Sequence, residues 1–197
     1  MKPLAPTAAL LFAAACSPAP TRDDAPASTP TPATPAPARP GPTPASAPTP
    51  STPANVLTLE GLGALHIGRP VPAGSDWAER GAQIPDTPCR TISSPRHPGV
   101  YAIVEDGIVR RISIGQRSDV TLVEGIGPGA TERAVRAAFP GFRETPHEYI
   151  AAPGKNLTAP NAGSGDVALR FEIDAEGRVS TVHVGTMPVL AYSEGCA

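Results

Sequence analysis

The residue types that could do chemistry in this chain are three cysteines and four histidines, and their spacing limits what that chemistry can be. The histidines, His66, His97, His147 and His183, stand apart from one another and form neither an HxH nor an HExxH pattern. They are therefore predicted to lie on the surface or in turns. The serines occur in no GxSxG or SxxK arrangement. The sequence predicts a non-enzymatic protein with no catalytic residue, no metal site and no cofactor.

Cys16 ends a segment that is typical of protein export. Lys2 precedes an apolar run over residues 4–15, which is too short to cross a bilayer as a mature helix. The run Ala13-Ala14-Ala15-Cys16 resembles the bacterial lipobox, in which cleavage precedes a cysteine that receives acyl chains. The resemblance implies a lipoprotein signal peptide over residues 1–15, lipidation of Cys16 and, from Ser17, sorting to the outer membrane with the domain in the periplasm. The alternative is an ordinary secretory signal and a secreted periplasmic product.

If Cys16 is acylated, Cys89 and Cys196 remain as an even pair in an oxidising compartment. A disulfide between them is predicted, which would close a loop of about 107 residues and hold the C-terminus across the domain. The alternatives are a metal pair with His147 or His183, or a redox thiol. Neither cysteine has the spacing of a zinc or CxxC site.

Proline divides the chain into two parts. The 38 residues 17–54 contain 13 prolines and consist otherwise mainly of alanine, threonine and serine, so they lack the apolar area that offsets chain entropy. Residues 16–54 are therefore predicted to be a lipid-anchored disordered tether, and residues 55–197 a single domain. The net charge of −2 and the scattered basic residues give no reason to expect nucleic acid as a partner.

A hairpin pattern occurs twice in the domain. Residues 99–115 (GVYAIVEDGIVRRISIG) match residues 169–185 (LRFEIDAEGRVSTVHVG) under an ungapped shift of 70 positions, which places Tyr101 on Phe171 and Gly107 on Gly177. Asp106-Gly107 predicts a two-residue type I′ turn, because both central positions of that turn need positive φ. The residues expected to share the core-facing side of the first hairpin are Tyr101, Ile103, Ile108, Ile112 and Ile114. The repetition predicts a duplicated unit.

A short helix is expected before each hairpin. Ser75 is the expected N-cap of a helix that includes Asp76 and Trp77, and Thr131 the N-cap of a helix over residues 132–139 that ends at Pro140-Gly141. A strand is expected over residues 148–151, followed by a loop over residues 152–166 that is rich in Gly, Pro and Asn.

These elements predict an α+β fold. Its two tandem repeats, residues 57–115 and 122–185, each consist of a short helix plus an antiparallel hairpin. They form a shared antiparallel sheet with helices on one face, followed by a C-terminal tail over residues 186–197.

The order of these pieces resembles small periplasmic modules of the β-lactamase-inhibitor-protein type and the outer-membrane assembly lipoprotein BamE. The segments that carry the resemblance are LHIGRPV at 65–71 and EGIGPGATERAVRAAFPG at 124–141, each followed by a hairpin. The Ser193-Glu194-Gly195-Cys196 ending is similar to that of uncharacterised bacterial lipoproteins. The first repeat departs from the pattern, because Pro70, Pro72 and Gly74 occupy the usual helix start. No binding residue is carried over from these families.

Together these features indicate a non-enzymatic cell-envelope lipoprotein that is a protein-binding or structural module in the periplasm, with another envelope protein as its partner. The alternative is a module that binds a small ligand or a cell-wall fragment through the 152–166 loop and Trp77. Trp77 is the only tryptophan and is expected to be a buried anchor, with ligand stacking as its other possible role.

Overall fold

The computed structural model describes residues 55–196, so the predicted signal peptide, Cys16 and the predicted tether lie outside the described residues. The described part contains twelve strands, one α-helix and two 3₁₀ helices. In chain order they are β1 (Val56–Leu57), β2 (Gly61–Leu62), β3 (Leu65–His66), β4 (Ala78–Glu79), β5 (Cys89–Ser93), β6 (Val100–Glu105), β7 (Ile108–Gly115), β8 (Thr121–Leu122), α1 (Glu132–Ala138), β9 (Arg143–Pro146), β10 (Lys155–Thr158), η1 (Ala162–Ser164), β11 (Ala168–Ile173), β12 (Val179–Gly185) and η2 (Val189–Ala191).

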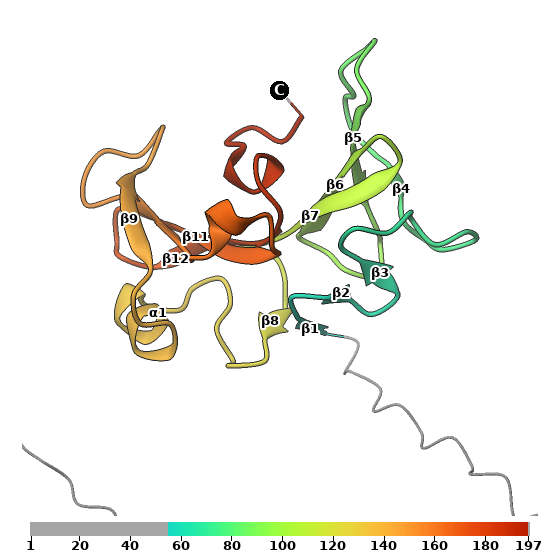
Figure 1. The fold of residues 1–197 in the computed structure, drawn as a ribbon. Coiled ribbons are helices and arrows are strands. Elements are labelled where there is room, and N and C mark those ends of the chain that lie inside the picture. The colour runs from blue at the N-terminus through green and yellow to red at the C-terminus, as the bar shows by residue number, and fades with distance from the viewer. Residues whose placement is uncertain (1–54, 197) are drawn as a thin grey trace, which may run out of the picture. The chain divides into compact units, whose positions relative to one another are not determined.

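Eight strands form one antiparallel sheet in the order β4-β5-β6-β7-β12-β11-β10-β9. Both predicted hairpins form, β6 with β7 and β11 with β12, and they join through the pairing of β7 with β12. Figure 1 shows the first four-stranded half in green and the second in orange to red. Equivalent strands therefore lie at equal distances from the central β7–β12 pair.

The register of the central pair has a local two-fold symmetry. Ser113 on β7 lies opposite His183 on β12, and these two residues are 70 positions apart, which is the offset between the two hairpin sequences. On either side Ile112 lies opposite Val184 and Ile114 opposite Val182. A duplicated hairpin that pairs with its own copy produces this register.

The ungapped alignment of the two hairpins is wrong by one residue in their first strands. In the first hairpin, Glu105 pairs with Ile108 across a two-residue turn, and Asp106 and Gly107 both have positive φ, as the sequence predicted. In the second hairpin, the Asp174 N–H donates to the Arg178 carbonyl across a three-residue turn, residues 175–177. The extra residue places Phe171 opposite Val182, so its equivalent in the first hairpin is Ala102 rather than Tyr101.

The predicted core-facing side of the first hairpin is also wrong in part. Ile112 and Ile114 do face the main core, but their cross-strand partners are Ala102 and Val100. Tyr101 and Ile103 lie opposite Ser113 and Arg111 on the other face of the sheet. Each hairpin has a register shift near its turn. The shift leaves Arg110 in the first hairpin and Ser180 in the second without a cross-strand partner.

The predicted α+β class with helices on one face is wrong, because the described residues are mostly strand. The expected helix from Ser75 does not form; Ala78 and Glu79 instead pair with β5 as an edge strand. The pairing with β5 requires an extended backbone, so it overrides the local helix signal of Ser75 and Asp76. The second expected helix is α1, where the Thr131 side chain accepts from the Ala134 N–H. One of the two expected helices therefore forms within residues 55–196.

The core lies on one face of the large sheet. It is covered by α1 and by a small sheet of order β3-β2-β1-β8, in which β1 pairs with β8 in parallel. Leu57, Leu62, Leu122 and Val135 bury their side chains against the inward aliphatic residues of β6, β7, β11 and β12. The middle of the opposite face is covered by the C-terminal residues, drawn in red in Figure 1. We call residues 186–196 the C-terminal strap.

Candidate functional site

Polar side chains gather on the face of the sheet beneath the C-terminal strap. The Ser113 hydroxyl lies 2.7 Å from Nδ1 of His183, and Nε2 of His183 lies 3.1 Å from Oε1 of Glu172. The three residues come from β7, β12 and β11, three adjacent strands. Ser113 is 0% exposed and His183 2% exposed, so the predicted surface position of His183 is wrong. Its side chain does point away from the main core, but the strap covers it.

Burial fixes the ionisation of this chain of groups. Desolvation lowers the pKa of His183, so the imidazole is neutral at pH 7. Burial, the largest single effect, raises the pKa of Glu172, but the hydrogen bonds from His183 and Thr181 and the nearby imidazoles of His183 and His147 together lower it to about 2. A carboxylate only accepts hydrogen bonds, so Nε2 of His183 carries the proton and Nδ1 accepts from Ser113. Nε2 of His147 lies 3.8 Å from the other carboxylate oxygen of Glu172, Oε2.

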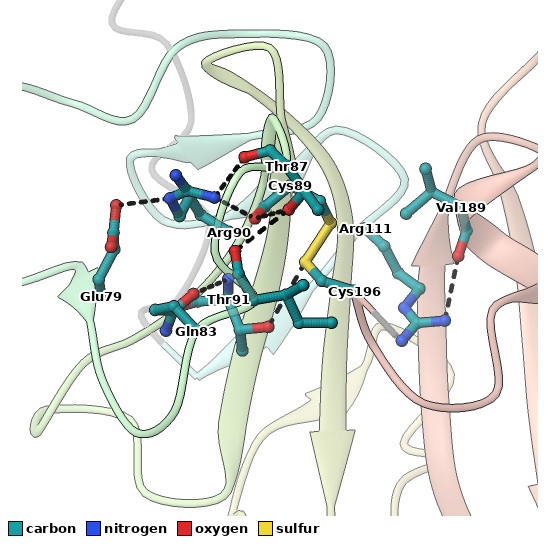
Figure 2. The surroundings of a disulfide bond; sticks show 10 residues. Glu79, Gln83, Thr87, Cys89, Arg90, Thr91, Arg111, Val189 and Cys196 are labelled. Carbon is teal, nitrogen blue, oxygen red and sulfur yellow. Dashed lines mark hydrogen bonds and ion pairs between the residues drawn. A yellow bond between two sulfur atoms is a disulfide. The ribbon is translucent and has the colours of Figure 1, made fainter.

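Two arginines on the same face hold the strap. Arg111, fully buried on β7, donates from Nη1 to the carbonyl of Val189 at 3.0 Å and also to that of Tyr192. Figure 2 shows this guanidinium reaching the Val189 carbonyl. Arg170 on β11 donates to the carbonyl of Ala191 at 3.4 Å. The Val189 carbonyl also accepts from the Tyr192 N–H within the 3₁₀ turn, and the arginines add side-chain donors to the carbonyls at the end of this helix.

The end of the strap is bonded to the first half of the sheet. Cys196 forms a disulfide with Cys89 on β5, as the sequence predicted, with Cα atoms 5.6 Å apart (Figure 2). Ile103 and Val189 pack around Cys89 in a small second core. The strap therefore contacts both halves of the sheet, through the disulfide on β5 and through Arg170 on β11.

The order hydroxyl, imidazole, carboxylate in Ser113, His183 and Glu172 is that of a nucleophile relay. A nucleophile must meet its substrate, and the Ser113 side chain has no solvent-accessible surface beneath the strap. The arrangement therefore pairs buried polar groups on three strands and stabilises the sheet. Sequence reasoning missed Arg111, Arg170 and Glu172 as a cluster.

A hollow with a mainly apolar wall lies at one end of the main core. It has a volume of about 620 Å³, within the range of ligand sites, and opens between the small sheet, α1 and β11. Its apolar lining comes from Leu57, Leu59, Leu122, Val123, Ala138, Phe139, Pro140, Phe142, Ala159, Pro160, Val167, Ala168 and Leu169. We call it the apolar groove.

The groove exists because α1 is short. Pro140 and Gly141 stop the helix after Ala138, and Phe139 and Phe142 turn back against Phe171, with ring centroids 5.5 and 5.8 Å from that ring. At the rim, Leu59 is 46% and Val123 70% exposed, so the apolar lining extends to the protein surface.

The charged residues that line the groove are both acidic, Glu60 and Glu124. A hydrogen bond with Thr58 lowers the pKa of Glu60, so this carboxylate is ionised at neutral pH. Thr58 and Asn161 are the neutral polar residues of the lining. The groove therefore combines an apolar floor with a negative edge.

The structure does not bring together the two parts of the predicted ligand site. Trp77 packs against the main core and stacks on His97, with ring centroids 5.7 Å apart, beside the β4 edge of the sheet. Residues 152–166 lie at the opposite edge and are not a simple loop, since they contain β10 and η1. The strand expected over residues 148–151 does not form; β9 and β10 flank that segment instead.

Within residues 55–196 no group of three or more His, Cys, Asp or Glu side chains is placed to hold a metal ion. Cys89 and Cys196 are joined to each other, so neither is a ligand with His147 or His183. Among the described residues no helix is long and apolar enough to cross a membrane.

Comparison with known proteins gives no relative: no family profile, curated protein or solved structure matches the chain. The resemblance to the β-lactamase-inhibitor-protein and BamE types stays a prediction from short motifs, and the mostly β structure departs from the α+β fold that it implies.

Proposed function

We propose that this chain is a non-enzymatic binding module of the bacterial cell envelope whose apolar groove holds a segment of a partner protein. The observation that carries the proposal is the groove itself. Leu59 and Val123 remain exposed beside a floor of Phe139 and Phe142, and such contiguous apolar surface is typical of interaction sites.

The charge at the rim selects the kind of partner. Glu60 and Glu124 line the opening, and no arginine or lysine does. They would repel the carboxylate or phosphate head of a lipid and attract a lysine or arginine. The occupant is therefore an apolar peptide segment with basic residues beside it, whose aliphatic side chains fill the floor while its cations meet the carboxylates.

The export signal and Cys16 supply the cellular setting of the proposal. Lipidation of Cys16 would hold the domain at the outer membrane, and residues 17–54 would let it reach partners in the periplasm. A secreted periplasmic form without the lipid is the alternative setting.

A peptide-binding measurement tests the groove. The full chain is titrated with a fluorescein-labelled 15-residue peptide that has a leucine-rich centre and lysines at both ends, and binding is followed by fluorescence anisotropy. A second peptide has glutamates in place of the lysines. We expect the lysine peptide to bind at least tenfold more tightly than the glutamate peptide, and we expect Val123→Ser to weaken it at least fivefold.

Matched variants control for non-specific attraction. Glu124→Lys at the rim is expected to weaken the lysine peptide, whereas Glu176→Lys, the same change in the exposed turn of the second hairpin, leaves its affinity unchanged. Equal losses in the two variants, or equal binding of the two peptides, would remove the groove as the site.

A further inference from the structure

A second hollow lies in the first half of the sheet, where β5 ends, β6 begins and β7 ends. It has a volume of about 570 Å³ and shares no lining residue with the apolar groove. Two loops form its walls, residues 94–99 and 115–118. Gly99, with φ of +76°, brings them together: its carbonyl accepts from the Gly115 N–H, and a Cβ there would lie 2.7 Å from the Ser118 nitrogen.

The charged groups in this hollow are cationic. Arg80 and Arg117 line it, and no carboxylate does. The nearest acids along the chain are engaged elsewhere, since Glu79 pairs with Arg90 at 3.5 Å and Asp119 accepts from the Asn55 amide at 3.0 Å. Within the described part of the chain, Arg80 and Arg117 make no ion pair.

Neutral hydrogen-bonding groups complete the lining. Ser93, Ser94, Tyr101 and Gln116 contribute hydroxyl and amide donors to it. His97 also lines the hollow, and its Nδ1 is buried with no hydrogen-bond partner among the described residues. A buried polar atom without a partner calls for one, and a ligand in the hollow would lie beside His97.

We propose that this hollow binds an oxyanion, a phosphate or carboxylate group held between Arg80 and Arg117. A guanidinium presents its N–H groups as a planar fork that matches two oxygens of such a group, and two guanidiniums facing one hollow suit a ligand with more than one negative charge. The phosphate can come from a soluble compound or from a phospholipid headgroup, which share this chemistry.

Trp77 reports on this site without a label. It is the only tryptophan, and it stacks on His97 in the wall of the hollow, at an interplanar angle of 13°. Inorganic pyrophosphate is titrated into the full chain carrying Cys16→Ser, and tryptophan fluorescence is recorded. We expect a saturable change, and at least a fivefold loss of affinity in Arg117→Gln and in Arg80→Gln.

The matched control is Arg133→Gln, which removes an exposed arginine on α1, outside the hollow. It is expected to bind pyrophosphate like the parent protein, and circular dichroism checks that each variant is folded. Arg117 donates no side-chain hydrogen bond among the described residues, so its variant is the cleaner of the two. A non-saturable response, or an equal loss in Arg133→Gln, would overturn the proposal.

A second arm separates the two sources of phosphate. The same Cys16→Ser chain is sedimented with vesicles of phosphatidylglycerol and of phosphatidylcholine. Binding to phosphatidylglycerol alone, lost in Arg117→Gln, supports a headgroup ligand, whereas pyrophosphate binding without vesicle binding supports a soluble one. If neither probe binds, or if both still bind the Arg80→Gln and Arg117→Gln variants, the site is not an oxyanion site.

Discussion

At the residue scale, His183 is the group whose environment differs most from what its type suggests. It is neutral, buried between Ser113 and Glu172, and close to two guanidiniums, Arg111 and Arg170. Protonating it would place another positive charge in a buried space beside two guanidiniums. The folded state therefore disfavours protonation of His183, whereas the unfolded chain binds this proton more readily.

This exclusion predicts acid sensitivity. The pKa of His183 is lowered in the folded state and is about 6.5 in the unfolded chain. Below pH 6.5 the unfolded state binds more protons, so the free energy of unfolding decreases as the pH falls, by at most about 1.4 kcal/mol per pH unit for this group. His183→Gln is expected to be less stable at pH 7.5 but to lose less stability between pH 6.5 and pH 5. Urea unfolding at a series of pH values measures this.

The exposed His66 supplies the control, because His66→Gln removes a histidine without changing the buried cluster. Its unfolding free energy should follow the parent protein across the pH range. A His183→Gln variant with the same pH dependence as the parent would show that His183 ionises freely in the fold.

Arg111 is the second residue with a definite role. Its guanidinium is the hydrogen-bond donor for the Val189 and Tyr192 carbonyls, and Arg111→Met would leave these acceptors without it. We expect a loss of about 1–3 kcal/mol in the free energy of unfolding, the usual cost of buried polar groups left unpaired. Arg133→Met on exposed α1 should change it by less than about 0.5 kcal/mol. Urea denaturation compares the two variants, and equal effects would contradict the role of Arg111 in holding the C-terminal strap.

At the element scale, the C-terminal strap couples the two halves of the sheet. Its disulfide spans 107 residues, for which the chain-entropy relation gives about 4–5 kcal/mol. Val189 and Leu190 are buried, so we expect the strap to keep these noncovalent contacts in the reduced protein. We therefore expect Cys196→Ser to lower the unfolding free energy by about 2–4 kcal/mol, measured by urea unfolding without reductant. Addition of a dithiol should abolish the difference between parent and variant; a difference that persists would point to a role of Cys196 other than the bond.

The elements also show which parts of the fold local sequence encodes. Asp106-Gly107 and Thr131 are local signals, and the turn and the helix cap form where they predict. The one-residue difference between the hairpins lies in the turn after Asp174, where Ala175 is extra, and alternation alone does not reveal such an insertion. Tyr101 and Ile103 are apolar, so local sequence assigns them to the main core. They lie on the opposite face, which is covered by the C-terminal strap about 85 positions further along the chain.

The candidate sites were hidden from the sequence for a similar reason. Ser113, Glu172 and His183 are unremarkable in the chain and meet only through strand pairing. The groove depends on where α1 stops relative to the small sheet, and Arg80 and Arg117 line one hollow although they are 37 positions apart in the chain. Such long-range placement has no local periodicity, whereas three cysteines, with Cys16 set aside as the predicted acylated residue, leave one pair for the Cys89–Cys196 bond.

At the scale of the whole molecule, the folded domain follows a predicted lipid-anchored tether in the chain. We expect cells grown with an alkyne-labelled palmitate to label the parent chain, and we expect the chain to sediment with membranes. Cys16→Ser should abolish both, since Cys16 is the predicted acylated residue. A Ser17→Ala variant should stay labelled. Unlabelled parent protein in the soluble fraction would favour the secreted alternative.

The measurement that tests the central claim most directly is hydrogen–deuterium exchange of the full chain with and without the lysine-flanked apolar peptide. We predict that the peptide slows exchange in the groove segments, residues 57–60, 122–124 and 139–142. It should cause no change in β4 and β5, which form the edge at the other end of the large sheet. Protection at that edge with none in the groove would contradict the claim that this protein binds its partner there.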